Sequence, residues 1–159
     1  MHPIKLFIEK PDQKFQSSDH VLNITLDGKE CPDANSFYSV IQKLFHFPDY
    51  FGKNLDGLFD CMTDLSWIEQ KHIELLICNP DQMMECEEHD TDLFINFLFL
   101  IDEVLIEWSL DAERLVPNKT FDCFIEGTTK IQNQLDENDI IYEWMIHNQE
   151  TADNSTFSS

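Results

Sequence analysis

The sequence is poor in glycine and in basic side chains. Only 4 of its 159 residues are Gly, and neither G-x-G-x-x-G nor G-x-x-x-x-G-K-[ST] occurs, which excludes nucleotide binding by such loops. Lys and Arg number 10 against 31 Asp and Glu, so the net charge is −21 at pH 7. A surface this negative repels nucleic acid and anionic membranes and attracts basic proteins. We therefore expect a protein partner, and neither nucleic acid nor a membrane.

Cysteine usage and hydropathy indicate the cellular compartment in which the protein resides. The five Cys are irregularly spaced and include no C-x-x-C pair. No basic-then-apolar leader opens the sequence, and its longest apolar run, residues 93–101, is too short to cross a bilayer. Reduced thiols in a cytoplasmic protein are the simplest interpretation.

Catalytic and metal-binding patterns are missing as well. No G-x-S-x-G elbow occurs, and no motif combines a nucleophile, a base and an orienting group. Asp102 and Glu103 are adjacent, point in different directions on a helix, and make a poor acid–base pair. Metal-ligating residue types gather around one polar stretch: Cys78, Cys86, His89, Asp90 and Asp92. They lack the paired spacing of zinc ligands, so we predict no enzyme, no catalytic residue, no metal site and no cofactor.

Strand and helix patterns alternate along the chain. Strand-like runs occupy residues 4–8, 21–26, 73–77 and 120–126. Helical apolar stripes occupy residues 36–45, with Asn35 as the expected N-cap, the stretch that begins at Leu55, and residues 92–108. Residues 81–92 and 109–119 read as connections, 140–146 as a further helix or strand, and 151–159 as a frayed end. Strands separated by helices predict parallel pairing with right-handed crossovers.

The most informative stretch is residues 47–63, FPDYFGKNLDGLFDCMT. Pro48 and Gly52 favour a rigid loop, and Asn54 is a good N-cap for a helix that starts at Leu55. An apolar stripe follows at i, i+3, i+4 and i+7: Leu55, Leu58, Phe59 and Met62. Acidic residues recur every fourth position on another face: Asp56, Asp60 and Asp64.

The acidic face is unfavourable for an isolated helix. Like charges four residues apart oppose each other, and the helix dipole opposes Asp64 near the C-terminal end. A basic partner would make use of this arrangement, whereas a merely solvated acidic face is the alternative. Residues 81–113 hold eleven Asp or Glu and no Lys or Arg, which predicts a second acidic surface beside this helix.

The loop and helix resemble the barstar family of ribonuclease inhibitors, whose pattern is Pro-x-Tyr-aromatic-Gly-x-Asn-Leu-Asp-Ala-Leu-Trp-Asp. Nine residues match without a gap: Pro48, Tyr50, Phe51, Gly52, Asn54, Leu55, Asp56, Leu58 and Asp60. Gly57 replaces the usual Ala, and Phe59 replaces the usual Trp. The resemblance implies an α/β fold with a small three-stranded parallel sheet and packed helices over residues 21–126. Residues 1–20 would be an N-terminal extension, and residues 127–159 a C-terminal one with a frayed end.

The resemblance also implies a function. The protein would be an immunity protein, or antitoxin, that forms a heterodimer with a basic ribonuclease toxin and blocks its active site. Asp60 would mimic the RNA phosphate, Asp56 would face a basic loop, and Tyr50 would pack over the catalytic centre. The full predicted partner-binding set is Tyr50, Phe51, Asn54, Asp56, Phe59, Asp60, Thr63 and Asp64.

Two points stay open at this level. The family's acid on the later helix aligns with either Asp102 or Glu103. A second family Trp corresponds to Leu65 or is displaced to Trp67, and these departures indicate a nuclease different from the family's best-known target. The alternative function is an acidic adaptor that binds some other basic partner without inhibiting a nuclease.

Overall fold

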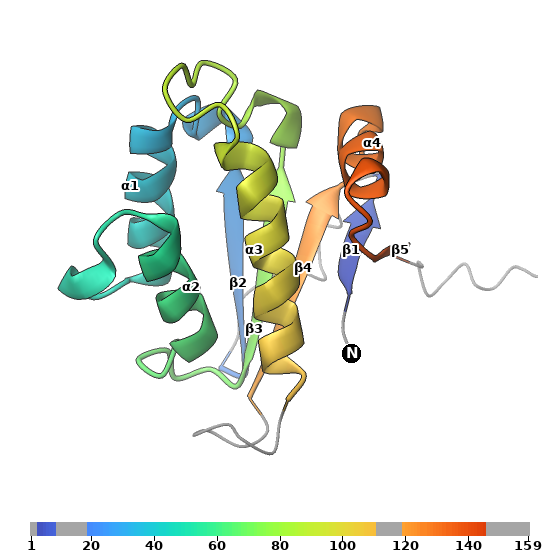
Figure 1. Cartoon of the computed structure of the whole chain (residues 1–159). Helices are drawn as coiled ribbons and strands as arrows, with labels where there is room; N and C mark the ends of the chain where they lie inside the picture. Colours follow the sequence, from blue (N-terminus) through green and yellow to red (C-terminus); the bar gives the residue numbers. More distant parts are fainter. Residues whose placement is uncertain (1–2, 9–18, 111–118, 146–159) are drawn as a thin grey trace, which may run out of the picture.

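The computed structural model of the chain describes residues 3–8, 19–110 and 119–145 (Figure 1). The main elements are β1 (Ile4–Phe7), β2 (Val21–Asp27), α1 (Ala34–Phe45), α2 (Leu55–Asp64), β3 (His72–Cys78), α3 (Leu93–Trp108), β4 (Thr120–Glu126), α4 (Thr129–Glu137) and β5 (Tyr142–Trp144). Within these ranges, single-turn 3-10 helices also occur: η2 (Gly28–Glu30), η3 (Asp49–Phe51) and η4 (Pro80–Gln82). In these ranges, no helix combines the length and the apolar character that crossing a bilayer requires.

The strands form one parallel sheet in the order β2-β3-β4-β1-β5 (Figure 1). The predicted α/β class and parallel pairing are confirmed, and β2, β3 and β4 lie side by side as expected. The expected number of strands is wrong, because the sheet has five strands and not three. Residues before and after 21–126 supply β1 and β5. Pairing with β1 satisfies the N–H and C=O groups that β4 would otherwise leave open at a sheet edge.

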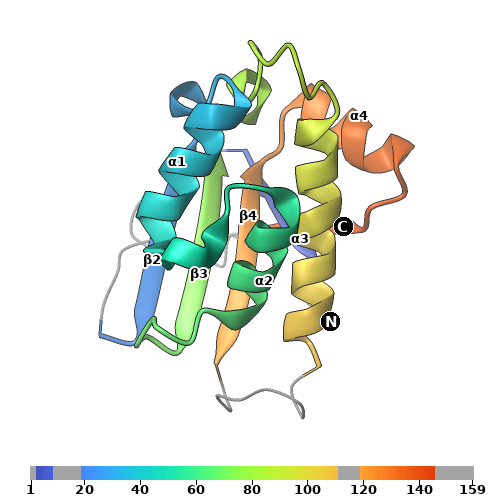
Figure 2. The ribbon, with the colours of Figure 1, turned by 60° about the vertical axis from the view of Figure 1, so that its left-hand side comes forward.

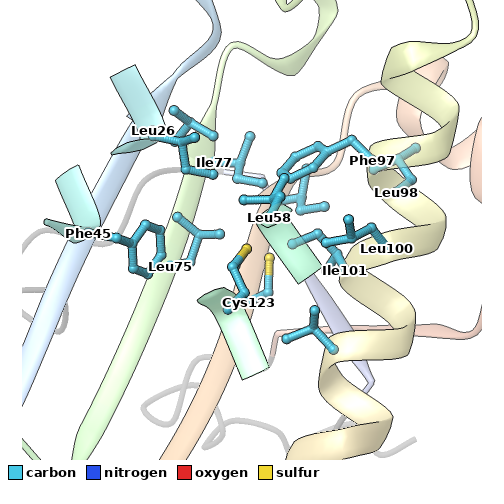
Figure 3. Close-up of a cluster of buried hydrophobic side chains, with 14 of the residues drawn as sticks. Leu26, Phe45, Leu58, Leu75, Ile77, Phe97, Leu98, Leu100, Ile101 and Cys123 are labelled. Carbon is cyan, nitrogen blue, oxygen red and sulfur yellow. The ribbon is translucent and has the colours of Figure 1, made fainter. Parts of the chain in front are cut away.

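Helices α1, α2 and α3 cover one face of this sheet (Figures 1 and 2). Side chains alternate along a strand, so every second residue of β3 points to these helices, and Ile73, Leu75 and Ile77 are buried. Helix α3 meets them with rings and aliphatic groups such as Phe97 and Ile101 (Figure 3). The shared core holds α2 and α3 in contact on top of the sheet.

Several predicted boundaries shift. Helix α1 begins at Ala34 rather than at residue 36, because Asp33 is the N-cap instead of Asn35. The Ser36 N–H donates to Asp33 Oδ1 at 2.9 Å, and Ser36 Oγ accepts from the Asp33 N–H at 3.2 Å. This reciprocal pair is a capping box, and hydrogen bonds from Ser36 lower the pKa of Asp33.

The C-terminal part contains a helix that the sequence pattern did not reveal. Helix α4 has only two buried side chains, Ile131 and Leu135, which is too weak an apolar stripe to stand out. The run at 140–146 resolves as strand β5. Residues 111–118 of the connection predicted at 109–119, and the predicted frayed end at 151–159, fall outside the described residues.

Candidate functional site: an acidic groove between α2 and α3

Buried rings beneath the loop before α2 fix its shape. The Phe51 ring lies 4.9 Å from that of Phe47 and 6.0 Å from that of Tyr38, measured between centroids. Phe47 in turn stacks on Phe45 at 5.3 Å. Phe51, which the resemblance places in the partner-binding set, is only 1% exposed. That expectation is corrected here: Phe51 supports the loop from below, and Tyr50 beside it is 64% exposed.

The turn into α2 uses residues with special backbone roles. Gly52 adopts φ of 76°, the positive value anticipated for it. The Asn54 side chain caps the helix, because its Oδ1 accepts from the Gly57 N–H at 2.7 Å while its Nδ2 donates to the Gly52 carbonyl at 3.2 Å. The predicted N-cap is therefore confirmed. Both polar ends of the Asn54 side chain hold the loop against the helix.

Gly57 has a structural reason to differ from the family's usual Ala. A Cβ on Gly57 would lie 1.9 Å from the carbonyl oxygen of Phe51, far inside van der Waals contact. The missing Cβ lets the loop lie directly on the first turn of α2. The position of Tyr50 is thereby coupled to that of the acidic helix.

Side chains from distant elements anchor the other end of α2. The last carbonyls of a helix lack intrahelical partners, and here they receive side-chain donors. Trp108 Nε1 donates to the Met62 carbonyl at 2.8 Å. The Nζ of Lys119, which is only 4% exposed, donates to the carbonyls of Leu65 (2.7 Å) and Ile68. A cation there also suits the negative end of the helix dipole.

A groove of about 470 Å³ runs between α2 and α3. Its lining comprises Leu55, Asp56, Phe59 and Asp60 of α2 and Asn96, Phe99, Leu100 and Glu103 of α3. Asp56, Asp60 and Glu103 place carboxylates on it, among apolar and aromatic side chains. Of the two acids left open by the sequence, Glu103 lines the groove. Asp102 is half-buried beside it, and burial, followed by the charge of Glu103, raises its pKa.

The remaining predicted residues lie at the edge of the groove or support it. The pKa of Tyr50 is raised by desolvation first, then by Cys61, Asp64 and Asp60 and by a hydrogen bond with Asp64. Tyr50 therefore lies close to the acidic face of α2. The Thr63 hydroxyl donates back to the Phe59 carbonyl at 2.8 Å. The structure thus brings Asp56, Phe59 and Asp60 into the groove and places Tyr50 and Asp64 next to one another.

A second acidic hollow lies at the N-terminal end of α1. It has a volume of about 490 Å³ and is lined by Asp33, Ala34, Asn35, Cys86, Glu87, Glu88, His89 and Asp90. Glu87 has a structural task there: Oε1 accepts from the Ala34 N–H at 2.7 Å, and Oε2 accepts from the N–H groups of His89 and Asp90. These hydrogen bonds, led by that from Asp90, lower the pKa of Glu87. Over the described ranges, no three His, Cys, Asp or Glu side chains are grouped to hold a metal ion.

Sequence reasoning indicated an acid on α3, either Asp102 or Glu103, but missed the other α3 residues of the groove and the anchors of α2. Asn96 and Phe99 belong to a helix whose apolar pattern extends almost all round, so no pattern distinguished its groove-facing residues. Lys119 and Trp108 contact α2 across 54 and 46 positions of sequence. Nothing in the local pattern around either residue indicates such a contact.

Comparison with known proteins finds a matching family model and curated relatives. The family model described as "Barstar (barnase inhibitor)" matches residues 21–125, which is more than half of the chain. The Bacillus subtilis (strain 168) protein named "Putative ribonuclease inhibitor YrdF" is 35% identical over 46 residues. That alignment covers 29% of this chain and 48% of the relative, so the chain spans about half the length of the curated relative it matches.

Proposed function

Because the chain belongs to the barstar family, we propose that it is an inhibitor that binds a basic ribonuclease through the α2–α3 groove and the loop before α2. The observation that carries the proposal is the set of three carboxylates, Asp56, Asp60 and Glu103, that line one groove between two packed helices. The exposed ring of Tyr50 stands beside it. The name of the Bacillus subtilis relative is in keeping with this role.

The proposed mechanism is occupation of a phosphate site. A ribonuclease must hold the phosphate of its RNA among cationic side chains, and a carboxylate is attracted to the same place but has no bond for the enzyme to cleave. Asp60 lies on a helix whose two ends are tied down by Asn54 and Lys119. Little conformational freedom is then left to be lost on binding, which favours affinity. The chain acts by binding and performs no catalysis.

Charge and thiol state fit an immunity protein. A net charge of −21 steers a basic nuclease toward the inhibitor and raises the rate of encounter, most strongly at low salt. All five cysteines lie in the described part of the chain, and none of them is joined in a disulfide, as expected in a reducing cytoplasm. We therefore place the protein in the cytoplasm, where it would neutralise a ribonuclease toxin as a heterodimer.

Steady-state inhibition kinetics test the proposal. Purified barnase and a set of other basic ribonucleases are titrated with the protein at several RNA concentrations. We expect inhibition of at least one of them, with an apparent inhibition constant that rises with RNA concentration because inhibitor and substrate compete for one site. Binding without inhibition would favour the acidic adaptor, and a failure to bind any of these nucleases would contradict the proposal.

A further inference from the structure

The solvent-exposed face of α3 carries two large apolar side chains in line with the groove. Phe99, Glu103 and Ile106 recur at i, i+4 and i+7, so they share one face of the helix. Phe99 is 38% exposed and Ile106 is 39% exposed. The opposite face of α3 already supplies the core: Leu93, Phe97, Leu98, Leu100, Ile101, Val104, Leu105 and Trp108. Core packing therefore does not account for Phe99 and Ile106.

This apolar face is continuous with the candidate site. Phe99 and Glu103 both line the groove that also contains Asp60. Ile106 lies one turn beyond Glu103 along the same line. A rigid partner that brings cations to Asp60 and Glu103 would therefore cover Phe99 and reach Ile106.

Charge indicates which partner can dock here. The exposed acids Glu103 and Glu107 lie on the same side of α3, and α3 contains no Lys or Arg. A second copy of a chain with a net charge of −21 would bring like charges together on this face. A basic nuclease neutralises those acids instead. A stable heterodimer typically buries about 800 Å² of each partner, and an interface that extends along α3 adds apolar area to that of the groove.

We infer that the nuclease-binding surface continues from the groove along α3 through Phe99 and Ile106, and that the partner has an apolar patch beside its cationic active site. This inference rests on the proposed function and adds a property of the partner. Phe99 and Ile106 supply the apolar part of the interface. Asp56, Asp60 and Glu103 supply its charged part.

The test compares matched surface variants in the same nuclease assay. The double variant Phe99→Ser with Ile106→Ser is measured against Ile8→Ser, which changes an isoleucine that is 76% exposed at the end of β1, and against Asp60→Ala. The probes are the purified ribonucleases that the wild-type protein inhibits, barnase first. We expect the double variant to raise the inhibition constant about tenfold, mainly through faster dissociation, and Ile8→Ser to leave it unchanged. Salt dependence should change for Asp60→Ala and not for the double variant.

Each outcome is decisive. An unchanged inhibition constant for the double variant, together with weaker inhibition by Asp60→Ala, overturns the apolar extension and leaves the proposed function standing. A protein that inhibits no ribonuclease contradicts the proposed function, and the inference falls with it. Thermal unfolding of all variants shows whether the fold is kept, and because both positions are substantially exposed, the melting temperature of the double variant should not fall.

Discussion

The groove side of the molecule and the edge formed by β1, α4 and β5 each contain a glycine with a very close neighbour, but the neighbours differ in kind. At Gly57 the neighbour is backbone: a Cβ would lie 1.9 Å from the Phe51 carbonyl oxygen. At Gly127 it is the far end of the Trp144 ring, 2.6 Å from such a Cβ. The loop carbonyl belongs to Phe51, whose ring is buried, whereas the Trp144 side chain is 40% exposed. The close neighbour of Gly57 is therefore fixed backbone, whereas that of Gly127 is a side chain.

The two regions differ in electrostatics as well. Asp56, Asp60 and Asp64 crowd one helix face, although like charges at this spacing destabilise a helix. At the other edge, Lys5 lies 3.8 Å from Asp122 and over the Phe124 ring, an ordinary stabilising arrangement. The charged surface on the groove side lowers the stability of the fold somewhat, as is common at binding sites.

The largest effect on the fold is expected from Gly57→Ala. Alanine favours a helix by about 1 kcal/mol over glycine, but the clash with the Phe51 carbonyl forces the loop away from α2. We expect the free energy of unfolding to fall by about 2 kcal/mol, as for other overpacked sites, and nuclease inhibition to weaken because Tyr50 moves. Urea denaturation and the inhibition constant measure the two effects.

Gly127→Ala is the matched change at the other edge. There the close neighbours are the far end of the Trp144 ring and, at 3.2 Å, the Leu6 Cβ. The free energy of unfolding should therefore fall by less than about 1 kcal/mol, which is a smaller loss than for Gly57→Ala, and inhibition should be unaffected. Equal losses of inhibition in the two variants would contradict the claim that only the groove side of the molecule is coupled to nuclease binding.

A second, somewhat smaller loss is expected from Lys119→Met. The variant keeps most of the apolar side chain but removes the ammonium that donates to the carbonyls of Leu65 and Ile68. Leaving buried acceptors unsatisfied costs about 1–3 kcal/mol, partly offset because a buried ammonium no longer has to be desolvated. Amide hydrogen exchange should speed up at the C-terminal end of α2 and much less in α4. Uniform acceleration in both helices would show that Lys119 stabilises the fold as a whole and does not hold α2 in particular.

The smallest effect is a gain from Asp102→Asn. The pKa of Asp102 is raised in the folded protein by burial and by Glu103, so its ionised form destabilises the fold. That penalty is absent below the unfolded pKa of about 3.9 and appears as the pH rises through the higher folded value. We expect the variant to have a higher melting temperature than wild type at pH 7 and the same melting temperature at pH 3. Glu137→Gln, which neutralises an exposed acid on α4, is the control and should change the melting temperature less.

Much of the fold could be predicted from the sequence because the strand and helix patterns are local. The runs that became β2, β3, β4 and α3 are long or strongly apolar, and Asn54 is a residue type that suits an N-cap. Strand β1 was indicated, but its place next to β4 depends on pairing between residues over a hundred positions apart, which no local pattern encodes. Helix α4 was missed because Ile131 and Leu135 are its only buried side chains.

The candidate site could be predicted only in part. The acids of α2 belong to the matched motif, so the sequence indicated their position. The groove also requires residues of α3, whose packing against α2 the sequence does not show. The sequence could not choose between Asp102 and Glu103, because a single residue of helical rotation decides which of them faces α2. Phe51 shows that a motif match does not predict exposure. The residue matches the family pattern, but its ring lies beneath the surface and not on it.

The most direct measurement of the central claim is the inhibition constant of Asp60→Asn beside that of Glu137→Gln, with a ribonuclease that the wild-type protein inhibits. Both changes remove one exposed carboxylate and keep the size of the side chain, so they alter the net charge equally. If Asp60 occupies the phosphate site, Asp60→Asn should raise the inhibition constant on the order of 100-fold, and Glu137→Gln should change it less than about twofold. Equal small changes in both variants would contradict the account, because general negative charge would then explain the binding.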